Sequence, residues 1–163
     1  MIRIGQGWDR HPLSPGRRCV LGGVAFPDSP VGPVGHSDGD AVCHAVTDAL
    51  LGAAGLGDIG YHFPDTDDRW AGADSLELLR QAVTMVQEAG FRVVNVDATV
   101  ITEQPAIAPR SEAMRGALAG ALRIDPQLVS VKATRGEGLG PEGRGECVTV
   151  QAVALLEVQG EGR

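Results

Sequence analysis

The sequence predicts an α+β fold in which a mixed β-sheet packs on helices. Hydrophobic residues alternate along the last long segment, Cys147–Val158, as they do in a strand with one buried face. In other segments they recur every three or four residues, as in helices with one buried face. A chain of 163 residues without an internal repeat also suits a single domain with a sizeable core. We therefore expect one domain over residues 1–163.

The N-terminal third is predicted to hold two short strands and the first helix. Residues 3–4 and 18–26 favour strands, and the turn-rich stretch LSPGRR separates them. Residues 37–55 then predict a helix, because carboxylates fill its first turn and a glycine can end it. Ser37 and Asp38 are the candidate N-caps.

The remainder alternates between helix and strand. After a loop dense in Gly, Asp and Pro, residues 75–89 have a helical spacing of apolar side chains, and a proline starts a third helix over residues 109–122. Strands are expected at residues 91–101, 128–134 and 147–158. The apolar faces of the first and last of these strands are expected to be Val94, Val96, Ala98 and Val100, and Val148, Val150, Ala152, Ala154, Leu156 and Val158.

The opposite face of the last strand is mixed in polarity. A second copy of the chain could bury that face, which would give a closed homo-oligomer. A solvated sheet face is also common, so the sequence leaves both arrangements open.

The composition argues against several classes of protein. Hydrophobic residues make up 43% of the chain, as in globular domains, and no apolar run is long enough to span a bilayer. The formal net charge is −7 and no basic block is present, which argues against binding to nucleic acid or to an anionic membrane. Three widely spaced cysteines and the lack of signal-peptide features favour a cytoplasmic protein with reduced thiols.

One carboxylate and one imidazole side chain near the N-terminus suggest a metal site. Asp9 and His11 are two residues apart, so in a strand they point to the same side, and His44 lies within the first predicted helix. One carboxylate and two imidazoles would leave a fourth position of a tetrahedral zinc ion open. Asp40 or Asp48, one helical turn from His44, could orient its ring. Alternatively, the Asp-x-His pair arises by chance and the polar side of the helix is its solvated face.

His36 lies in the turn GHSDGD, which leads into the first predicted helix. Backbone N–H groups and the helix dipole at such a position suit a phosphate, and an imidazole would add to that binding. The alternative is an ordinary histidine in a surface loop. His62, in YHFPDTD, is interpreted as a loop residue.

Taken together, the motifs RIGQGWDRH, LGGV, GHSDGDAVCHAVTDALLGAAGLGDIG, HFPDTD, KAT and GRGE resemble those of the 2-C-methyl-D-erythritol 2,4-cyclodiphosphate synthases. The resemblance covers nearly the whole chain. It implies a homotrimeric lyase of non-mevalonate isoprenoid biosynthesis, with α+β subunits and active sites between neighbouring subunits. The implied substrate is a cytidine diphosphate ester of methylerythritol phosphate, whose 2-phosphate attacks its β-phosphate, expels CMP and closes a cyclic diphosphate.

The resemblance also implies roles for individual residues. Asp9, His11 and His44 would bind Zn²⁺, and Glu137 would help to hold a second divalent ion, Mg²⁺ or Mn²⁺. His36 and Arg135 are implied as catalytic, and Arg144 and Glu146 lie near a trimer-axis cavity that can hold an isoprenoid diphosphate. The implied substrate contacts are Asp9, His11, His36, Ser37, Asp58, Ile59, Gly60, Phe63, Pro64, Asp65, Thr66, Asp67, Thr102, Glu103, Gln104, Pro105, Ala106, Ala108, Ala133, Thr134, Arg135, Glu137 and Arg144.

The chain differs from that family at two positions. Arg135 stands where threonine is frequent, at a position assigned to transition-state stabilisation, and Ala106 stands where lysine is common. An arginine would bring positive charge to the α- or β-phosphate. Without the lysine, recognition of cytosine depends on backbone contacts, or another group holds the phosphate.

The implied chemistry suits the charges of the chain. The substrate supplies its own nucleophile, so the protein needs no activated serine or cysteine; it has to bring two repelling phosphates together. An acidic chain with one lysine requires divalent ions for this. The rival hypotheses are a trimeric ligand-binding protein without catalysis, which would tolerate loss of the metal ligands, and a zinc hydrolase, against which the lack of an H-E-x-x-H-type motif argues.

Overall fold

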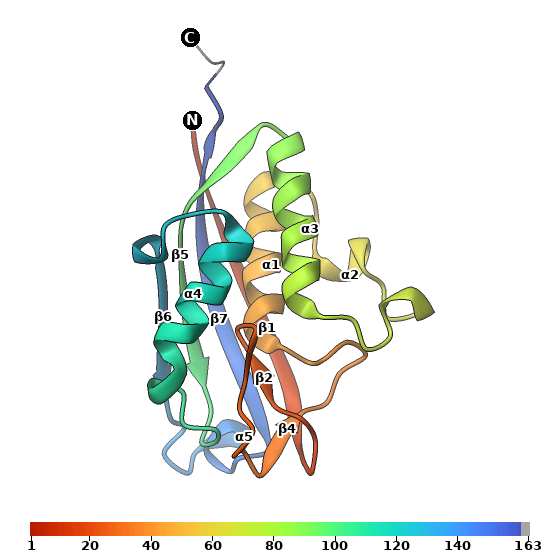
Figure 1. The fold of residues 1–163 in the computed structure, drawn as a ribbon, viewed down its shortest axis with the longest axis vertical. Helices are drawn as coiled ribbons and strands as arrows, with labels where there is room; N and C mark the ends of the chain where they lie inside the picture. The colour runs from red at the N-terminus through yellow and green to blue at the C-terminus, as the bar shows by residue number, and fades with distance from the viewer. Residues whose placement is uncertain (161–163) are drawn as a thin grey trace.

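The computed structural model describes residues 1–160 and has two layers, a sheet and a set of helices on one side of it (Figure 1). The five strands of the sheet lie in the order β4 (Val31–Pro33), β1 (Ile2–Pro15), β7 (Cys147–Val158), β5 (Phe91–Ile101) and β6 (Val129–Thr134). All neighbours are antiparallel except β5 and β6, which are parallel. The predicted α+β class with a mixed sheet is confirmed.

Three helices form the second layer: α1 (Ala41–Ala54), α3 (Ser75–Glu88) and α4 (Ser111–Leu122). The core lies between them and the sheet, and Leu50, Leu79 and Leu118 are among its fully buried side chains. The shorter helical turns are α2 (Ile59–His62), η1 (Asp68–Trp70), η2 (Ala108–Arg110), η3 (Pro126–Leu128) and α5 (Gly140–Gly143). No helix within residues 1–160 has the length and apolar character needed to cross a membrane.

The contact between β1 and α1 is unusually close. A Cβ atom built on Gly7 would lie 1.8 Å from the carbonyl oxygen of Ala45, and one on Gly5 would lie 2.0 Å from that of Ala49. Only glycine allows the two backbones to approach in this way. Because side chains two residues apart share a strand face, the residues that follow Gly7 at this spacing also point toward α1.

The N-terminal region differs from its prediction. β1 is one strand of 14 residues rather than a short strand at residues 3–4, because it pairs with β7 from Ile2 to Pro12. Residues 18–26 form a small hairpin, β2 (Val20–Leu21) and β3 (Val24–Ala25), rather than one strand. For β1, pairing with a distant strand outweighs the glycines and prolines in its sequence, which favour turns.

The N-cap of α1 is Asp40, so the prediction of Ser37 or Asp38 was wrong. The Asp40 side chain accepts hydrogen bonds from the backbone N–H groups of Val42 and Cys43, which places the helix start at Ala41. The predicted end is confirmed, since Gly55 has the left-handed conformation that closes many helices, with φ 75°.

Two of the predicted strand faces need correction. In β5 the buried residue is Val93 rather than Val94, because the pairing register shifts between Val93 and Asn95. In β7 the predicted apolar row is buried up to Leu156, but Val158 is 42% exposed.

Candidate metal centre

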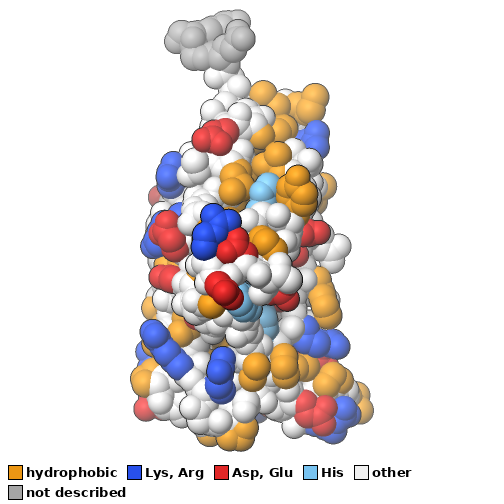
Figure 2. All heavy atoms as spheres, turned by 90° about the vertical axis from the view of Figure 1, so that its right-hand side faces the viewer, with side chains coloured by type: hydrophobic (Ala, Val, Ile, Leu, Met, Phe, Trp, Pro, Cys, Tyr) orange, Lys and Arg blue, Asp and Glu red, His pale blue; other side chains and the backbone are white. Residues whose placement is uncertain are grey.

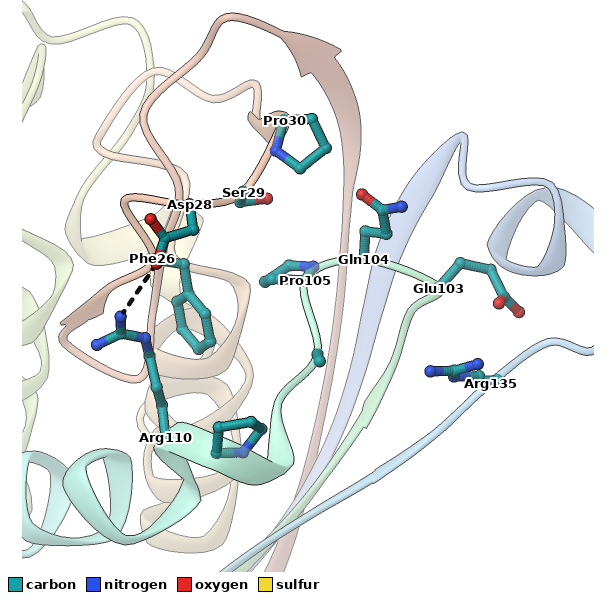
Figure 3. Close-up of a pocket in the computed structure, with 11 residues that line it drawn as sticks. Phe26, Asp28, Ser29, Pro30, Glu103, Gln104, Pro105, Arg110 and Arg135 are labelled. Atoms are coloured by element: carbon teal, nitrogen blue, oxygen red, sulfur yellow. Dashed lines mark ion pairs between the residues drawn. The ribbon is translucent and has the colours of Figure 1, made fainter.

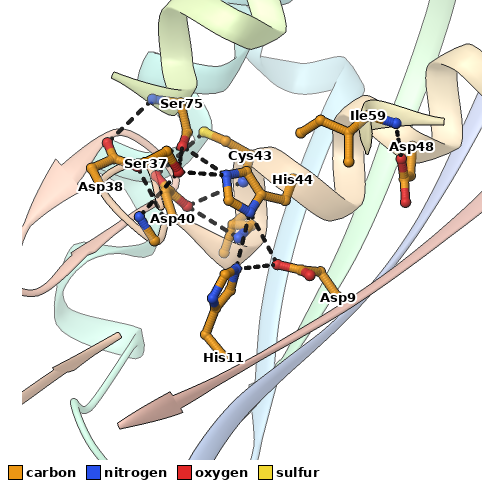
Figure 4. A network of polar contacts seen from close by, with 12 residues as sticks. Asp9, His11, Ser37, Asp38, Asp40, Cys43, His44, Asp48, Ile59 and Ser75 are labelled. Atoms are coloured by element: carbon orange, nitrogen blue, oxygen red, sulfur yellow. Dashed lines mark hydrogen bonds and ion pairs between the residues drawn. The ribbon is translucent and has the colours of Figure 1, made fainter. Parts of the chain in front are cut away.

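Three side chains from two elements converge on one point. Asp9 and His11 project from β1 and His44 projects from the facing turn of α1 (Figure 4). Asp9 Oδ2 lies 2.9 Å from His11 Nε2 and 3.2 Å from His44 Nδ1, and the two nitrogens are 3.0 Å apart. The predicted convergence of these three residues is confirmed. Within residues 1–160 they are the one group of three or more such side chains that could hold a metal ion.

The spacing of the three ligand atoms fits a tetrahedral ion. Metal–ligand bonds of about 2.0–2.1 Å separate neighbouring ligand atoms by roughly 3.3 Å, close to the sides of this triangle. His11 Nδ1 is 2.8 Å from the carbonyl oxygen of Val34, which can only accept. The Nδ1–H group therefore donates to Val34, and the lone pair of His11 Nε2 faces the centre of the triangle.

Electrostatics also favour a cation at this point. Burial would raise the pKa of Asp9, but hydrogen bonds and charge interactions with His11 and His44, made when these rings are protonated on the side that faces Asp9, hold that pKa far below its usual range. Burial would lower the pKa of His11, but Asp9 and the Val34 carbonyl raise it. The site thus stabilises positive charge between one carboxylate and two imidazoles, as expected of a metal centre.

The far side of the His44 ring contacts two serines. His44 Nε2 is 2.8 Å from Ser75 Oγ and 3.1 Å from Ser37 Oγ. The prediction that Asp40 or Asp48 orients this ring was wrong. Asp40 is fully buried among backbone donors, and Asp48 accepts the N–H of Ile59 at 2.8 Å. These carboxylates lie one turn from His44 along α1, but backbone N–H groups engage them instead.

Ser75 is a residue that sequence reasoning missed. It is the first residue of α3 and is 31 positions away from His44, so no local motif joins the two. The only local signal was a serine at the start of a predicted helix, which is usually explained by capping.

A cavity of about 310 Å³ opens beside the ligand triangle. The predicted His36, Ser37, Ile59, Phe63 and Asp65 line this cavity next to the metal centre, together with three apolar residues that were not predicted, Val34, Trp70 and Leu78. The complete lining is His11, Val34, Gly35, His36, Ser37, His44, Ile59, Phe63, Asp65, Trp70 and Leu78. On the face seen in Figure 2, histidine side chains reach the surface next to acidic side chains.

The other predicted substrate contacts between residues 58 and 67 do not line this cavity. Asp58 is the N-cap of α2 and accepts the N–H of Tyr61, and Gly60 lies within that turn. Pro64, Thr66 and Asp67 belong to the segment between α2 and η1. The ring of Phe63 meets that of Trp70 edge to face, with centroids 5.1 Å apart, so the loop presents an apolar wall to the cavity.

The predicted nucleotide residues gather at a different place. A cavity of about 200 Å³ is lined by Thr102, Glu103, Pro105, Ala106, Ile107, Ala108, Ala133, Thr134 and Arg135. An adjoining cavity of about 460 Å³ adds Gln104 and residues that were not predicted, including Phe26, Asp28 and Arg110 (Figure 3). Neither cavity shares a lining residue with the cavity at the metal centre.

Glu137 stands apart from the ligand triangle within this single chain. It has a left-handed backbone, φ 52°, and its N–H donates to Glu103 Oε1 at 3.1 Å. Arg144 pairs with Glu146 at 2.7 Å on the surface. The structure therefore brings Asp9, His11 and His44 together but leaves Glu137 and Arg144 outside that group.

Comparison with known proteins agrees with this geometry. The chain is 59% identical over 156 residues to a 2-C-methyl-D-erythritol 2,4-cyclodiphosphate synthase from Laribacter hongkongensis, and the alignment covers 96% of each sequence. A solved structure of 2C-methyl-D-erythritol-2,4-cyclodiphosphate synthase in a CDP-bound form aligns with a TM-score of 0.87 and 41% identity, covering 95% of this chain and 100% of that one.

A second solved structure, the bifunctional IspDF from Campylobacter jejuni, aligns with a TM-score of 0.93 and 41% identity. The alignment covers 97% of this chain and 42% of that protein, so the similarity is to one part of it. The sequence profile of the YgbB family matches residues 2–157. Because that match spans almost the whole sequence and the solved relatives share the fold, this chain belongs to the YgbB family.

Proposed function

We propose that this chain converts 4-diphosphocytidyl-2-C-methyl-D-erythritol 2-phosphate into 2-C-methyl-D-erythritol 2,4-cyclodiphosphate and CMP. It is thus a phosphorus–oxygen lyase of non-mevalonate isoprenoid biosynthesis. The observation that carries the proposal is the ligand triangle of Asp9, His11 and His44 beside a cavity, in a chain closely similar to synthases of this name. A protein that only bound a ligand would not need three metal ligands with an open coordination position.

The donor set favours zinc as the ion of the triangle. Two imidazole nitrogens and one carboxylate oxygen at tetrahedral spacing form a catalytic type of zinc site. When bound, the ion would supply Lewis acidity and a fixed point for a phosphate oxygen. Glu137 is the proposed ligand of a second divalent ion, Mg²⁺ or Mn²⁺, because its glycine-rich turn allows phosphate oxygens to approach.

In the reaction an oxygen of the 2-phosphate forms a bond to the β-phosphorus. The bond from that phosphorus to the bridging oxygen breaks, and the electron pair leaves with CMP. The protein binds and orients both phosphates, which gives an intramolecular reaction its advantage. His36 and Ser37 line the cavity and are the proposed contacts of the phosphorylated erythritol, and the apolar wall of Phe63 and Trp70 would exclude water from it.

The separation of the two sets of cavities supports an assembly of several subunits, and we propose a homotrimer. The substrate joins a cytidine to a phosphorylated erythritol, yet the proposed nucleotide cavity shares no lining residue with the metal cavity. A neighbouring subunit that presents residues 102–108 and 133–135 would complete the site. The CDP-bound relative supports a cytidine nucleotide as a ligand of this chain.

The uncovered face of the sheet also supports subunit contacts. Ile2, Ile4 and Trp8 lie on this face of β1 and are 68%, 72% and 49% exposed, and Val153 of β7 is 41% exposed. Such an apolar strip suits contact with further copies of the chain. Arg144 would then lie near the trimer axis, where we propose that it binds the diphosphate of an isoprenoid.

The test is a direct assay of the reaction. The purified chain is incubated with the substrate, and CMP and cyclic diphosphate are measured with and without a chelator. Both products should appear in equal amounts and only with metal present. No CMP under metal-replete conditions would favour a binding protein, and CMP without the cyclic product would favour a hydrolase.

A matched pair of histidine variants tests the ligand assignment. His44→Ala should lose zinc and turnover while the subunits stay assembled, because it removes one of three ligands. His62→Ala is the control, since that ring contacts the Leu56 carbonyl outside the triangle and should leave zinc content unchanged. An active, zinc-loaded His44→Ala variant would overturn the assignment.

A further inference from the structure

We propose that Ser75, held by Asp38, is a positioning residue that keeps the proton of His44 on Nε2, so that Nδ1 presents its lone pair to the metal. The inference rests on the metal site of the proposed function and adds two residues to it. The two residues come from outside the helix that contains His44 (Figure 4).

The first step concerns Asp38. Its Oδ1 accepts the hydroxyl of Ser75 at 2.5 Å and the N–H of Asp40 at 3.1 Å, and its Oδ2 accepts the N–H of Ser75 at 3.2 Å. Every contact of this carboxyl group is therefore with a donor, as expected of an ionised carboxylate. The contact with the Ser75 hydroxyl is charge-assisted and is the shortest of the three.

The second step concerns the single proton of the Ser75 hydroxyl. Because that proton is donated to Asp38, Ser75 Oγ can only accept from its other neighbours. His44 Nε2 lies 2.8 Å away, so it must carry the hydrogen that completes this contact. A neutral imidazole has one N–H, and His44 Nδ1 is consequently the lone-pair atom that faces Asp9 and His11.

Ser37 offers the opposite arrangement. Its hydroxyl is 3.1 Å from His44 Nε2, and by donating to that nitrogen it would move the proton to Nδ1, into the space of the metal. The contact with Ser75 is shorter, and Ser37 Oγ has another acceptor available in Ser75 Oγ at 3.2 Å. Ser75 is also fully buried at the first residue of α3, so its hydroxyl has little freedom to turn elsewhere.

The first test measures zinc affinity rather than turnover. Zn²⁺ is titrated, in competition with a chromophoric chelator, into the wild-type chain and into the Ser75→Ala and Ser37→Ala variants. Loss of a group that orients a ligand typically weakens metal binding by about 10–100-fold, and we expect this for Ser75→Ala. Ser37→Ala is the matched control and should weaken binding much less. Equal losses in the two variants, or wild-type affinity in Ser75→Ala, would overturn the proposal.

The second test needs no variant. Nitrogen–proton correlation spectra of the zinc-free wild-type chain distinguish the two neutral forms of histidine. We expect the neutral form of His44 to carry its hydrogen on Nε2, and a neutral form with the hydrogen on Nδ1 would overturn the proposal even if a variant failed to fold. A wild-type chain that took up no zinc would instead contradict the metal assignment of the proposed function, so the two failures are distinguishable.

Discussion

Asp40 links two parts of the chain through one buried carboxylate. Its oxygens accept the N–H groups of Gly22 and Gly23, in the turn between β2 and β3, at 2.8 and 2.7 Å. They also accept those of Val42 and Cys43, in the first turn of α1, at 3.0 and 3.1 Å. The side chain therefore fixes the start of the helix on which His44 lies, without touching the metal centre.

Asp40→Ala should lower the free energy of unfolding by about 2–4 kcal/mol, because it removes an N-cap and leaves buried donors unpaired. The measurement is urea denaturation with chelator present, so that zinc binding does not contribute. Asp125→Ala is the control: Asp125 caps η3 in an exposed position and its loss should cost less than about 1 kcal/mol. Similar losses in the two variants would contradict the role assigned to Asp40.

At the scale of residues, the sequence predicts contacts that follow from local spacing. Asp9 and His11 share a strand face by their two-residue separation. Their meeting with His44 was implied by the family resemblance rather than by spacing, and it is confirmed. Local spacing could not predict the hydrogen-bond partners of His44, because Ser75 contacts it only through the packing of α3 on α1. Asp40 and Asp48 had suitable spacing, but nearby backbone N–H groups were better partners.

The packing of β1 on α1 determines the geometry of the metal centre at the scale of elements. Gly5 and Gly7 let the strand lie against the helix, and Asp9 and His11 continue the same strand face. His44 approaches them from the helix at the end of this contact. The separation of the two backbones thus sets the size of the ligand triangle.

Gly7→Ala should cost more than about 3 kcal/mol of stability, because its methyl group would overlap the backbone of α1. Zinc affinity should fall with it, since the strand must move away from His44. Gly52→Ala is the matched control in α1: an added Cβ there meets open space, and the change should stabilise the chain by about 0.5–1 kcal/mol. Thermal unfolding and zinc titration of both variants check this, and a Gly7→Ala variant as stable as wild type would contradict the close contact.

The sequence predicts best those elements in which hydrophobic residues recur at a regular spacing over their whole length. α3 and β7 occupy the expected residues, with an error of one residue or less at each end. The N-terminal strand was underestimated because its glycines and prolines resemble a turn, and only pairing with β7, about 140 residues away, makes it a strand. The register shift in β5 likewise depends on its partner strand and has no signature in the sequence.

At the scale of the whole molecule, the helices cover one side of the sheet (Figure 1). Exposed apolar side chains form a strip on the other side. The proposed trimer would bury this strip. The mixed polarity of β7 suggested this arrangement at the level of sequence. It gave no indication that β1 would contribute three of the four residues of the strip, Ile2, Ile4 and Trp8, beside Val153 of β7.

Ile4→Arg should weaken assembly, because it places an unpaired charge in the proposed interface, and sedimentation should shift toward the mass of a single chain. CMP release should fall in parallel if neighbouring subunits complete the site. Ala89→Arg adds the same charge at the exposed end of α3, in the helical layer, and should keep both assembly and activity. A fully assembled Ile4→Arg variant would argue against this face as the interface.

The metal cavity and the nucleotide cavity share no lining residue, so different mutations can damage one and leave the other intact. If each catalytic unit takes its ion from one chain and its nucleotide contacts from the next, then two alleles that are each inactive can complement one another. A hybrid ring containing one chain with a damaged ligand triangle and another with a blocked nucleotide cavity would regain one intact junction between subunits.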